Sequence, residues 1–229
     1  FKHEKVNVVN FSKKNQYAFF KKLFIKYKIL NVLISSVVPR ISEDFFEIFN
    51  SLNVDFFQIK NLLKICKLKT NIKNKVSIGE DRLINVMYAK HIYVKSIVII
   101  DFGTATTVDV LDKNGVYDGG VITPGIELSL KSLQMGTAKL PLVNFKKTNS
   151  IVGRSTKEAI QSGFFWGYVS MMQGLIEKIQ KEKKTKFKII LTGGNAKFFE
   201  SCFENVIKID EYFNSKGLNY ITNTYFKKL

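Results

Sequence analysis

The chain contains few cysteine, histidine, proline and arginine residues for its length of 229 residues. Its two cysteines, Cys66 and Cys202, lie far apart with no CxxC spacing, and it has two histidines. Neither a disulfide framework nor a cluster of His and Cys metal ligands is therefore expected. The longest stretch without a charge, between Glu158 and Glu177, is interrupted by glycine, serine and glutamine, so no membrane span is expected. The cysteine usage favours a reducing, cytoplasmic location.

Positive charge dominates the chain, which has 36 Lys and Arg residues, 19 acidic residues and a formal net charge of +17. Such an excess is typical of proteins that bind nucleic acid. However, 33 of these cations are lysine and three are arginine, whereas base readout and bidentate phosphate binding rely on the planar guanidinium group. We attribute the lysine excess to the base composition of an AT-rich genome. The lysines would then form a solvated surface, and no nucleic-acid partner is expected. A basic nucleic-acid-binding module remains as an alternative.

The hydrophobic pattern predicts a mixed α/β protein with two parts, residues 1–95 and 96–229. Pro39 is expected to end a buried strand, and Ser42 to cap the helix that follows it. Strands or short apolar runs are predicted over residues 31–38, 54–59, 96–100, 106–111, 116–122 and 187–191. Helices are predicted over residues 16–27, 42–52, 81–90, 126–135 and 156–182.

The sharpest motif is DFGTATT at 101–107, directly after a buried strand. A carboxylate at the end of a strand can hold a cation, and Gly103 allows the backbone to pass close to a ligand. The threonine hydroxyls and free amide groups suit the phosphates of a nucleotide. The alternative is a tight β-hairpin whose Asp and Thr side chains bond to their own backbone. The spacing alone leaves both interpretations open.

Three shorter motifs also have both a structural and a functional interpretation. The GEDR motif at 79–82 suits a helix start, because acidic residues in a first turn face the positive end of the helix dipole. In GRST at 153–156, Ser155 or Thr156 can cap a helix with Glu158 nearby. The glycine pair of LTGG at 191–194 suits a plain strand-to-helix turn.

Taken together and in order, these motifs resemble those of type III pantothenate kinases. The resemblance covers nearly the whole chain from about Asn31 onward. It rests on SSVVP at 35–39, GEDR at 79–82, DFGTATT at 101–107, GGVITPGIELSL at 119–130, TAKLP at 137–141, GRSTKEAIQSG at 153–163 and LTGGNA at 191–196. It implies the actin-like ATPase fold, in which two ribonuclease H-like lobes with mixed sheets surround an ATP cleft.

The resemblance also implies an activity, the phosphorylation of pantothenate to 4′-phosphopantothenate by ATP with Mg²⁺, the first step of coenzyme A biosynthesis. Asp81 would be the general base, and Asp101 would bind a monovalent cation, K⁺ or NH₄⁺. The positions that match pantothenate-binding residues are Gly79, Glu80, Asp81, Arg82 and Thr156. Those that match ATP-binding residues are Gly103, Thr104, Gly193 and Gly194.

The same resemblance implies a homodimer whose substrate site is completed across the interface. Gly163 and Gly167, four residues apart with aromatic residues between them, suit either a packed core helix or such an interface. A second copy of the chain is therefore an expected partner, beside pantothenate and ATP.

Two departures from the family pattern set limits on this interpretation. Its first phosphate-binding hairpin, Asp-x-Gly-Asn-Thr, is missing from the sequence as given, which starts at Phe1. The N-terminal lobe is therefore expected to be incomplete, in a truncated record or by real loss. Glu80 also stands where a small residue is commoner. A non-catalytic or regulatory member of the fold that binds nucleotide or a partner protein is thus the alternative function.

Overall fold

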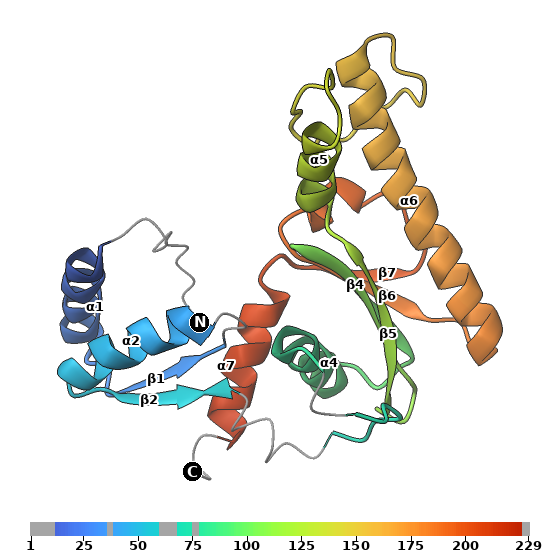
Figure 1. Ribbon diagram of the computed structural model, residues 1–229. Helices are drawn as coiled ribbons and strands as arrows, with labels where there is room; N and C mark the ends of the chain where they lie inside the picture. Colours follow the sequence, from blue (N-terminus) through green and yellow to red (C-terminus); the bar gives the residue numbers. More distant parts are fainter. Residues whose placement is uncertain (1–11, 36–38, 60–67, 75–77, 226–229) are drawn as a thin grey trace. The chain divides into compact units, whose positions relative to one another are not determined.

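The computed structural model describes residues 12–35, 39–59, 68–74 and 78–225 (Figure 1). The contacts divide these residues into two compact units, each discontinuous in sequence. The first unit contains the described residues within 1–67, 76–84 and 215–229, and the second those within 68–75 and 85–214. The boundary expected between residues 95 and 96 stays a prediction.

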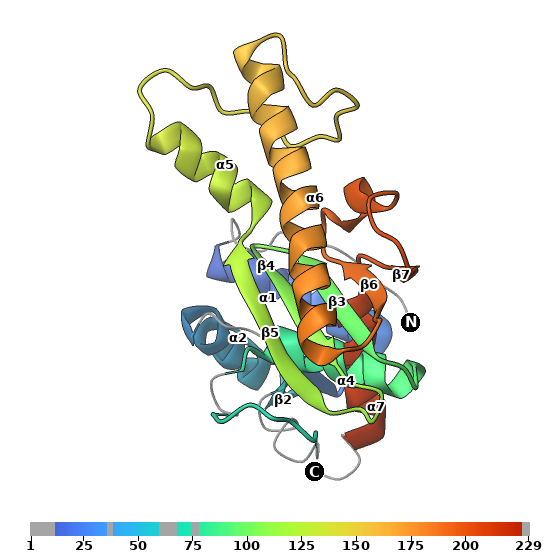
Figure 2. The same ribbon diagram turned by 90° about the vertical axis from the view of Figure 1, so that its right-hand side faces the viewer.

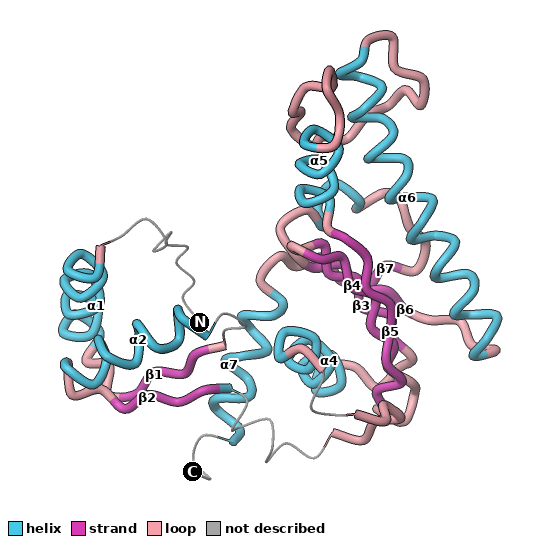
Figure 3. The backbone as a smooth tube through the Cα atoms, viewed as in Figure 1, coloured by secondary structure: helices cyan, strands magenta, loops and turns pink. Residues whose placement is uncertain are grey.

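The first unit contains a small parallel sheet and a cluster of phenylalanines. Its sheet pairs Asn31 with Asp55 and Ile34 with Gln58. Phe20 packs edge-on against Phe49, with ring centroids 5.0 Å apart; this cluster is the apolar core of the unit. The elements are α1 (Lys13–Tyr27), β1 (Asn31–Ile34), α2 (Pro39–Ser51) and β2 (Asp55–Gln58), drawn by type in Figure 3.

Helix α2 corrects one sequence expectation, because it begins at Pro39 and not after a cap at Ser42. Proline is favoured at the first helical position, where its fixed φ suits the helix and its missing N–H has no intrahelical partner to lose. The predicted strand over 31–38 is described as far as Ile34; residues 36–38 lie outside the described part. The SSVVP motif is thus seen only at its two ends.

The second unit is built on a five-stranded mixed sheet in the order β5-β4-β3-β6-β7. Strands β3, β4 and β5 are antiparallel neighbours, whereas β6 and β7 run parallel to β3. The mixed α/β architecture predicted from the sequence is therefore confirmed. The strands are β3 (Ile97–Phe102), β4 (Ala105–Leu111), β5 (Tyr117–Pro124), β6 (Lys188–Thr192) and β7 (Val206–Ile209).

Helices cover both faces of this sheet. Helices α5 (Ile126–Met135) and α6 (Thr156–Lys183) lie on one face, and α6 crosses in front of the strands in Figure 2. Helix α4 (Glu80–Ile92), which belongs to the second unit from Asn85 onward, lies on the other (Figure 1). We call these the α6 face and the α4 face.

The two faces take alternate residues of each strand. Apolar side chains of β3, β4 and β6 fill the α6 face and pack in one cluster with α5 and α6. On the α4 face, the pairs Asp101–Thr107 and Ile99–Asp109 lie opposite each other on β3 and β4. Asp109 is completely buried and accepts a hydrogen bond from the hydroxyl of Tyr117 at 2.6 Å. The sheet therefore separates an apolar layer from a layer that contains buried polar groups.

Two further elements after β6 were not predicted from the sequence, besides β7. The short 3₁₀ helix η2 (Ala196–Phe199) brings the ring of Phe199 onto Phe102, with centroids 4.3 Å apart. Helix α7 (Phe213–Tyr225) closes the described chain. Within the described residues, no helix combines the length and the apolar character needed to cross a membrane.

Candidate functional site

Asp101 lies at the carboxyl end of β3, next to the strand's last residue. One oxygen of its carboxylate, Oδ2, accepts a hydrogen bond from Nδ2 of Asn85 at 3.0 Å. The other oxygen, Oδ1, lies on the side of two glycines. A Cβ atom would be 2.5 Å from Oδ1 if built on Gly193 and 3.5 Å if built on Gly103. Gly103 therefore leaves room for a small group beside Oδ1, whereas the turn at Gly193 packs directly against this oxygen.

Gly193 is required by its backbone conformation as well as by this close packing. Its φ of +86° lies in the region that favours glycine, and a Cβ there would lie 2.6 Å and 2.7 Å from the backbone C and N of Phe102. The turn after β6 therefore packs directly on the end of β3. It brings together residues of two motifs, Asp101 and Gly103 of DFGTATT and Gly193 of LTGG. A Cβ on Gly194 would meet nothing within 4 Å, so this second glycine faces open space.

The DFGTATT motif forms a tight hairpin, as its structural interpretation predicted, but the Asp101 side chain accepts from Asn85, which lies outside the motif. The amide of Gly103 donates to the carbonyl of Ala105 at 3.2 Å, and the side chain of Thr104 at the tip is exposed. Gly125, the residue after β5, stabilises the tip, because its amide donates to the carbonyl of Thr104 at 3.1 Å. A Cβ on Gly125 would overlap the carbonyl oxygens of Gly103 and Thr104. The hydrogen bond and close packing of Gly125 thus fix the backbone of the hairpin, whereas the side chain of Thr104 is exposed.

The GEDR motif forms the first turn of α4, as its structural interpretation predicted, with both acidic residues in that turn. The side chain of Asp81 is exposed, and its Oδ1 accepts a hydrogen bond from the backbone N–H of Arg82 at 2.9 Å. A Cβ on Gly79 would lie 2.5 Å from that same oxygen. Glu80 accepts a hydrogen bond from Ser35 at 3.2 Å, which links this turn to the first residue of the SSVVP motif, directly after β1. Gly79 thus allows the observed orientation of the Asp81 carboxylate.

The GRST motif begins α6, and Ser155 is its cap. Its Oγ accepts from the amide of Glu158 at 3.3 Å, while the Glu158 carboxylate accepts from the amide of Arg154 at 2.8 Å. This reciprocal arrangement resembles a capping box. Thr156, the first residue of the helix, is exposed and takes no part in the cap. The helix cap therefore does not use the hydroxyl of Thr156.

Thr156 lines an apolar hollow of about 660 Å³ between the end of β5 and the helices α5 and α6. The hydroxyl of Tyr168 joins these three elements, because it donates to the carbonyl of Pro124 at 2.8 Å and lies 3.0 Å from Oγ of Ser129. Burial raises the pKa of Tyr168, and the hydrogen bond with Ser129 offsets part of that rise. Gly163 and Gly167 also line the hollow, and a Cβ on either would meet nothing within 4 Å.

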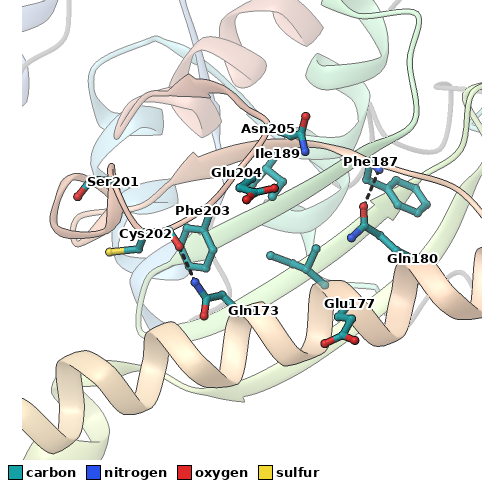
Figure 4. Close-up of a pocket in the computed structure, with 11 residues that line it drawn as sticks. Gln173, Glu177, Gln180, Phe187, Ile189, Ser201, Cys202, Phe203, Glu204 and Asn205 are labelled. Carbon is teal, nitrogen blue, oxygen red and sulfur yellow. Dashed lines mark hydrogen bonds between the residues drawn. The ribbon is translucent and has the colours of Figure 1, made fainter. Parts of the chain in front are cut away.

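A second hollow, of about 340 Å³, lies farther along α6 and contains none of the predicted site residues (Figure 4). Gln173 donates to the carbonyl of Cys202 at 2.8 Å, and Gln180 accepts from the amide of Phe187 at 3.2 Å. These bonds join α6 to the loop before β7 and to the segment that enters β6. Cys202 is a free, half-buried thiol whose pKa is raised by burial; Cys66 lies outside the described residues.

One polar residue beside the predicted site was missed by the sequence reasoning. Asn85 is 1% exposed and is surrounded in sequence by buried Ile84, Val86 and Met87. A buried amide inside such an apolar run is costly unless its hydrogen bonds are made. That isolated polar residue, one helical turn after Asp81, is the signal that could have identified it.

The site has the donors for a single hard cation but not for a multi-carboxylate metal centre. Among the described residues, no group of three or more His, Cys, Asp and Glu side chains could hold a metal ion. Oδ1 of Asp101 and the carbonyl oxygen of Ala105 lie on either side of the room left at Gly103, where a Cβ would be 3.5 Å and 3.4 Å from them, and both are oxygen donors of the kind that alkali and alkaline-earth cations prefer. The residues present therefore fit a cation held by one carboxylate and backbone oxygens.

Comparison with known proteins gives a consistent result. The family model of type III pantothenate kinase matches residues 2–178. A type III pantothenate kinase of Sulfurihydrogenibium sp. is 41% identical over 194 residues, which cover 84% of this chain and 77% of that protein. One of Pelagibacter ubique is 39% identical over 207 residues, covering 86% and 79%.

Among solved structures, a conserved protein of Campylobacter jejuni, described as a Baf family transcriptional activator, has a similar fold. Its TM-score is 0.63 at 20% sequence identity, over 91% of this chain and 89% of that one. At this identity the likeness concerns the fold alone.

Proposed function

The chain belongs to the type III pantothenate kinase family, and we propose that it transfers the γ-phosphoryl group of ATP to pantothenate. The products are 4′-phosphopantothenate and ADP, in the first step of coenzyme A biosynthesis. The observation that carries the proposal is the match of the family model over residues 2–178. The matched segment includes Gly79–Arg82, Asp101–Thr107 and Thr156. The cytoplasmic location expected from the cysteine content is part of the same proposal.

Asp81 is proposed as the general base. Its carboxylate takes the proton of the substrate's terminal hydroxyl while that oxygen bonds to the γ-phosphorus, and the bond from phosphorus to the bridging oxygen of ADP breaks. Phosphoryl transfer needs chiefly alignment and a positioned proton acceptor. The exposed side chain of Asp81, in the first turn of α4, is accessible to a substrate. Arg82 offers a forked donor to the pantothenate carboxylate or to phosphate oxygens.

The ATP phosphates are proposed to lie against the Gly103–Thr104 tip, and the adenosine side against Gly193 and Gly194. The open tip and the open space at Gly194 support this assignment. Mg²⁺ bound to the phosphates would neutralise the charge that develops during transfer. Asp101 would hold K⁺ or NH₄⁺ through Oδ1, in the room left at Gly103. The actin-like fold that the resemblance implies, with two ribonuclease H-like lobes and an ATP cleft, is part of the proposal.

A homodimer with a substrate site completed by the second copy is proposed as well. The support is a set of exposed large apolar side chains on α5 and on the segment that joins it to α6, the two helices that line the hollow with Thr156. They are Leu128, Met135, Leu142, Ile151 and Val152, with Met135 82% exposed. Sedimentation of the wild type and of Met135→Lys tests this: the variant should shift toward the monomer, and a monomeric wild type would contradict the dimer.

The central experiment compares Asp81→Asn with Asp55→Asn, the latter removing an exposed carboxylate of β2. Loss of a general base typically costs about 10²- to 10⁴-fold in rate, so kcat for pantothenate should fall by that factor in Asp81→Asn. ATP affinity, measured by calorimetry, should be kept in both variants. A near-wild-type rate for Asp81→Asn would end the general-base assignment. A wild type that binds ATP without turnover would favour the non-catalytic or regulatory alternative.

A further inference from the structure

Three side chains of the second unit are joined by hydrogen bonds in a line that ends at Asp101. Nδ2 of Asn214, at the start of α7, donates to Oδ1 of Asn85 at 3.1 Å. Nδ2 of Asn85, on α4, donates to Oδ2 of Asp101 at 3.0 Å. A primary amide can both accept and donate. The side-chain oxygen of Asn85 therefore accepts from α7, and its side-chain nitrogen donates to β3.

This line determines which oxygen of Asp101 faces the glycines. Oδ2 is turned toward Asn85, and Oδ1 consequently lies beside Gly193 and Gly103. A carboxylate whose inner oxygen accepts from the Asn85 amide is restrained in its rotation about its last bond. The outer oxygen thus keeps a defined position beside Gly103, where a Cβ would lie 3.5 Å from Oδ1 and 3.4 Å from the carbonyl oxygen of Ala105.

We infer that Asn85 is a positioning residue for a monovalent cation, which it serves by holding Oδ1 of Asp101 toward the ion, and that Asn214 supports it. The inference rests on the proposed role of Asp101 as the cation ligand. Partners outside the ligand shell commonly orient a ligand, and their loss weakens metal binding.

The surroundings of Asn85 argue against a purely structural role. Its helix neighbours Ile84, Val86 and Met87 are buried and apolar, and an apolar residue at position 85 would continue that pattern. Burying an amide brings little net stability, because its hydrogen bonds replace equally good ones to water. An asparagine at this position is explained by what it does for the Asp101 carboxylate.

The test compares Asn85→Leu with Gln161→Leu. Gln161 is a matched control, because it is a buried amide of α6, 3% exposed, whose Nε2 donates to the carbonyl of Asn144 at 3.0 Å. The readout is the rise in Tm with K⁺ at constant ionic strength, balanced with choline, which reports cation binding without turnover. The half-saturating K⁺ concentration should rise by about 10- to 100-fold in Asn85→Leu. It should stay at the wild-type value in Gln161→Leu, even if that variant melts earlier.

Two further variants keep the test decisive. If Asn85→Leu does not fold, Asn85→Ser, which is too short to reach Asp101, replaces it with the same expected direction. Asn214→Ala should give a smaller shift, because Asn85 keeps its bond to Asp101. Wild-type K⁺ dependence in the Asn85 variant, in a protein where Asp101→Asn abolishes the Tm response, would overturn the inference alone. No Tm response to K⁺ in the wild type would overturn the cation site and the inference together, whereas pantothenate phosphorylation is assayed separately and fails or succeeds independently.

Discussion

The two faces of the five-stranded sheet are made by alternate residues of the same strands, yet they bury different chemistry. The side chains that β3, β4 and β6 bury on the α6 face are apolar except for Thr106. The α4 face buries Asp109, Thr107 and Thr192 among isoleucines of β3 and β6, and presents Asp101. An apolar layer is stabilised by area and packing and tolerates few voids. A polar layer depends on particular donors and acceptors. Changes on the α6 face should therefore affect stability first, and changes on the α4 face should affect ligand binding first.

The largest effect on stability is expected from Phe199→Ala on the α6 face. Phe199 is completely buried and stacks on Phe102 and on Phe165, with centroids 4.3 Å and 5.6 Å away. Removing such a ring costs about 3–5 kcal/mol of unfolding free energy, which urea denaturation would measure. Val94→Ala, at a side chain that is 91% exposed, should cost about 0.5 kcal/mol or less. Similar losses in the two variants would contradict the assignment of this layer as the main source of stability.

Gly193→Ala should combine a moderate loss of stability with a loss of ligand binding. Its φ of +86° and the overlap of a Cβ with Oδ1 of Asp101 and the backbone of Phe102 both oppose a side chain. Strain of this kind costs about 1–3 kcal/mol, and the displaced Oδ1 should weaken the K⁺ response of Tm. Gly194→Ala, where a Cβ meets nothing, is the stability control. Equal Tm values for the two variants would show that the turn relaxes at no cost.

The two buried tyrosine hydroxyls allow a smaller, paired comparison. Tyr117→Phe removes a donor to the buried carboxylate of Asp109, and Tyr168→Phe removes a donor to the carbonyl of Pro124. Asp109 is completely buried, so no solvent replaces its lost donor. About 1–3 kcal/mol is therefore expected for Tyr117→Phe and about 1 kcal/mol for Tyr168→Phe. Urea denaturation at pH 7 tests this order; the reverse order would contradict the polar character assigned to the α4 face.

The Tyr168 hydroxyl also has a pH dependence of known sign. Burial raises its pKa above the ordinary value of 10.0, so folding favours the neutral phenol. Its contribution is complete below pH 10 and is lost as pH rises through the folded pKa. The stability difference between wild type and Tyr168→Phe should therefore shrink in strongly alkaline solution. A difference that grows with pH would contradict the direction of the shift.

The α6 face was largely predictable from the sequence, because local pattern decides it. The helix predicted over 126–135 has the observed bounds of α5, and that over 156–182 ends one residue early. The end of the α4 face was predictable only in part. Asp101, Gly103 and Gly193 stand out as motif residues, but the bond from Asn85 joins segments 16 residues apart that no local pattern links. The roles of these residues stay predictions.

The elements α7 and β7, which the sequence did not predict, likewise depend on packing between distant segments. Helix α7 contains glycine, serine, threonine and three asparagines, which have low helix propensity, and β7 has four residues. Phe213 and Ile221 on α7 are nevertheless completely buried, or nearly so. Tertiary burial therefore stabilises a helix that its sequence does not favour, and Asn214 reaches Asn85 only because that helix forms.

The smallest expected effect is a gain, and it separates the interior of α6 from its proposed interface. Glycine inside a helix is about 1 kcal/mol less favourable than alanine, and a Cβ on Gly174 or on Gly163 meets nothing within 4 Å. Both Gly→Ala variants should therefore raise the unfolding free energy of the monomer by about 0.5–1 kcal/mol. Gly163, unlike Gly174, lines the hollow of the proposed dimer surface, so sedimentation should show weaker association for Gly163→Ala alone. Equal association in the two variants would remove Gly163 from the interface, and the apolar surface around Met135 would then remain as its support.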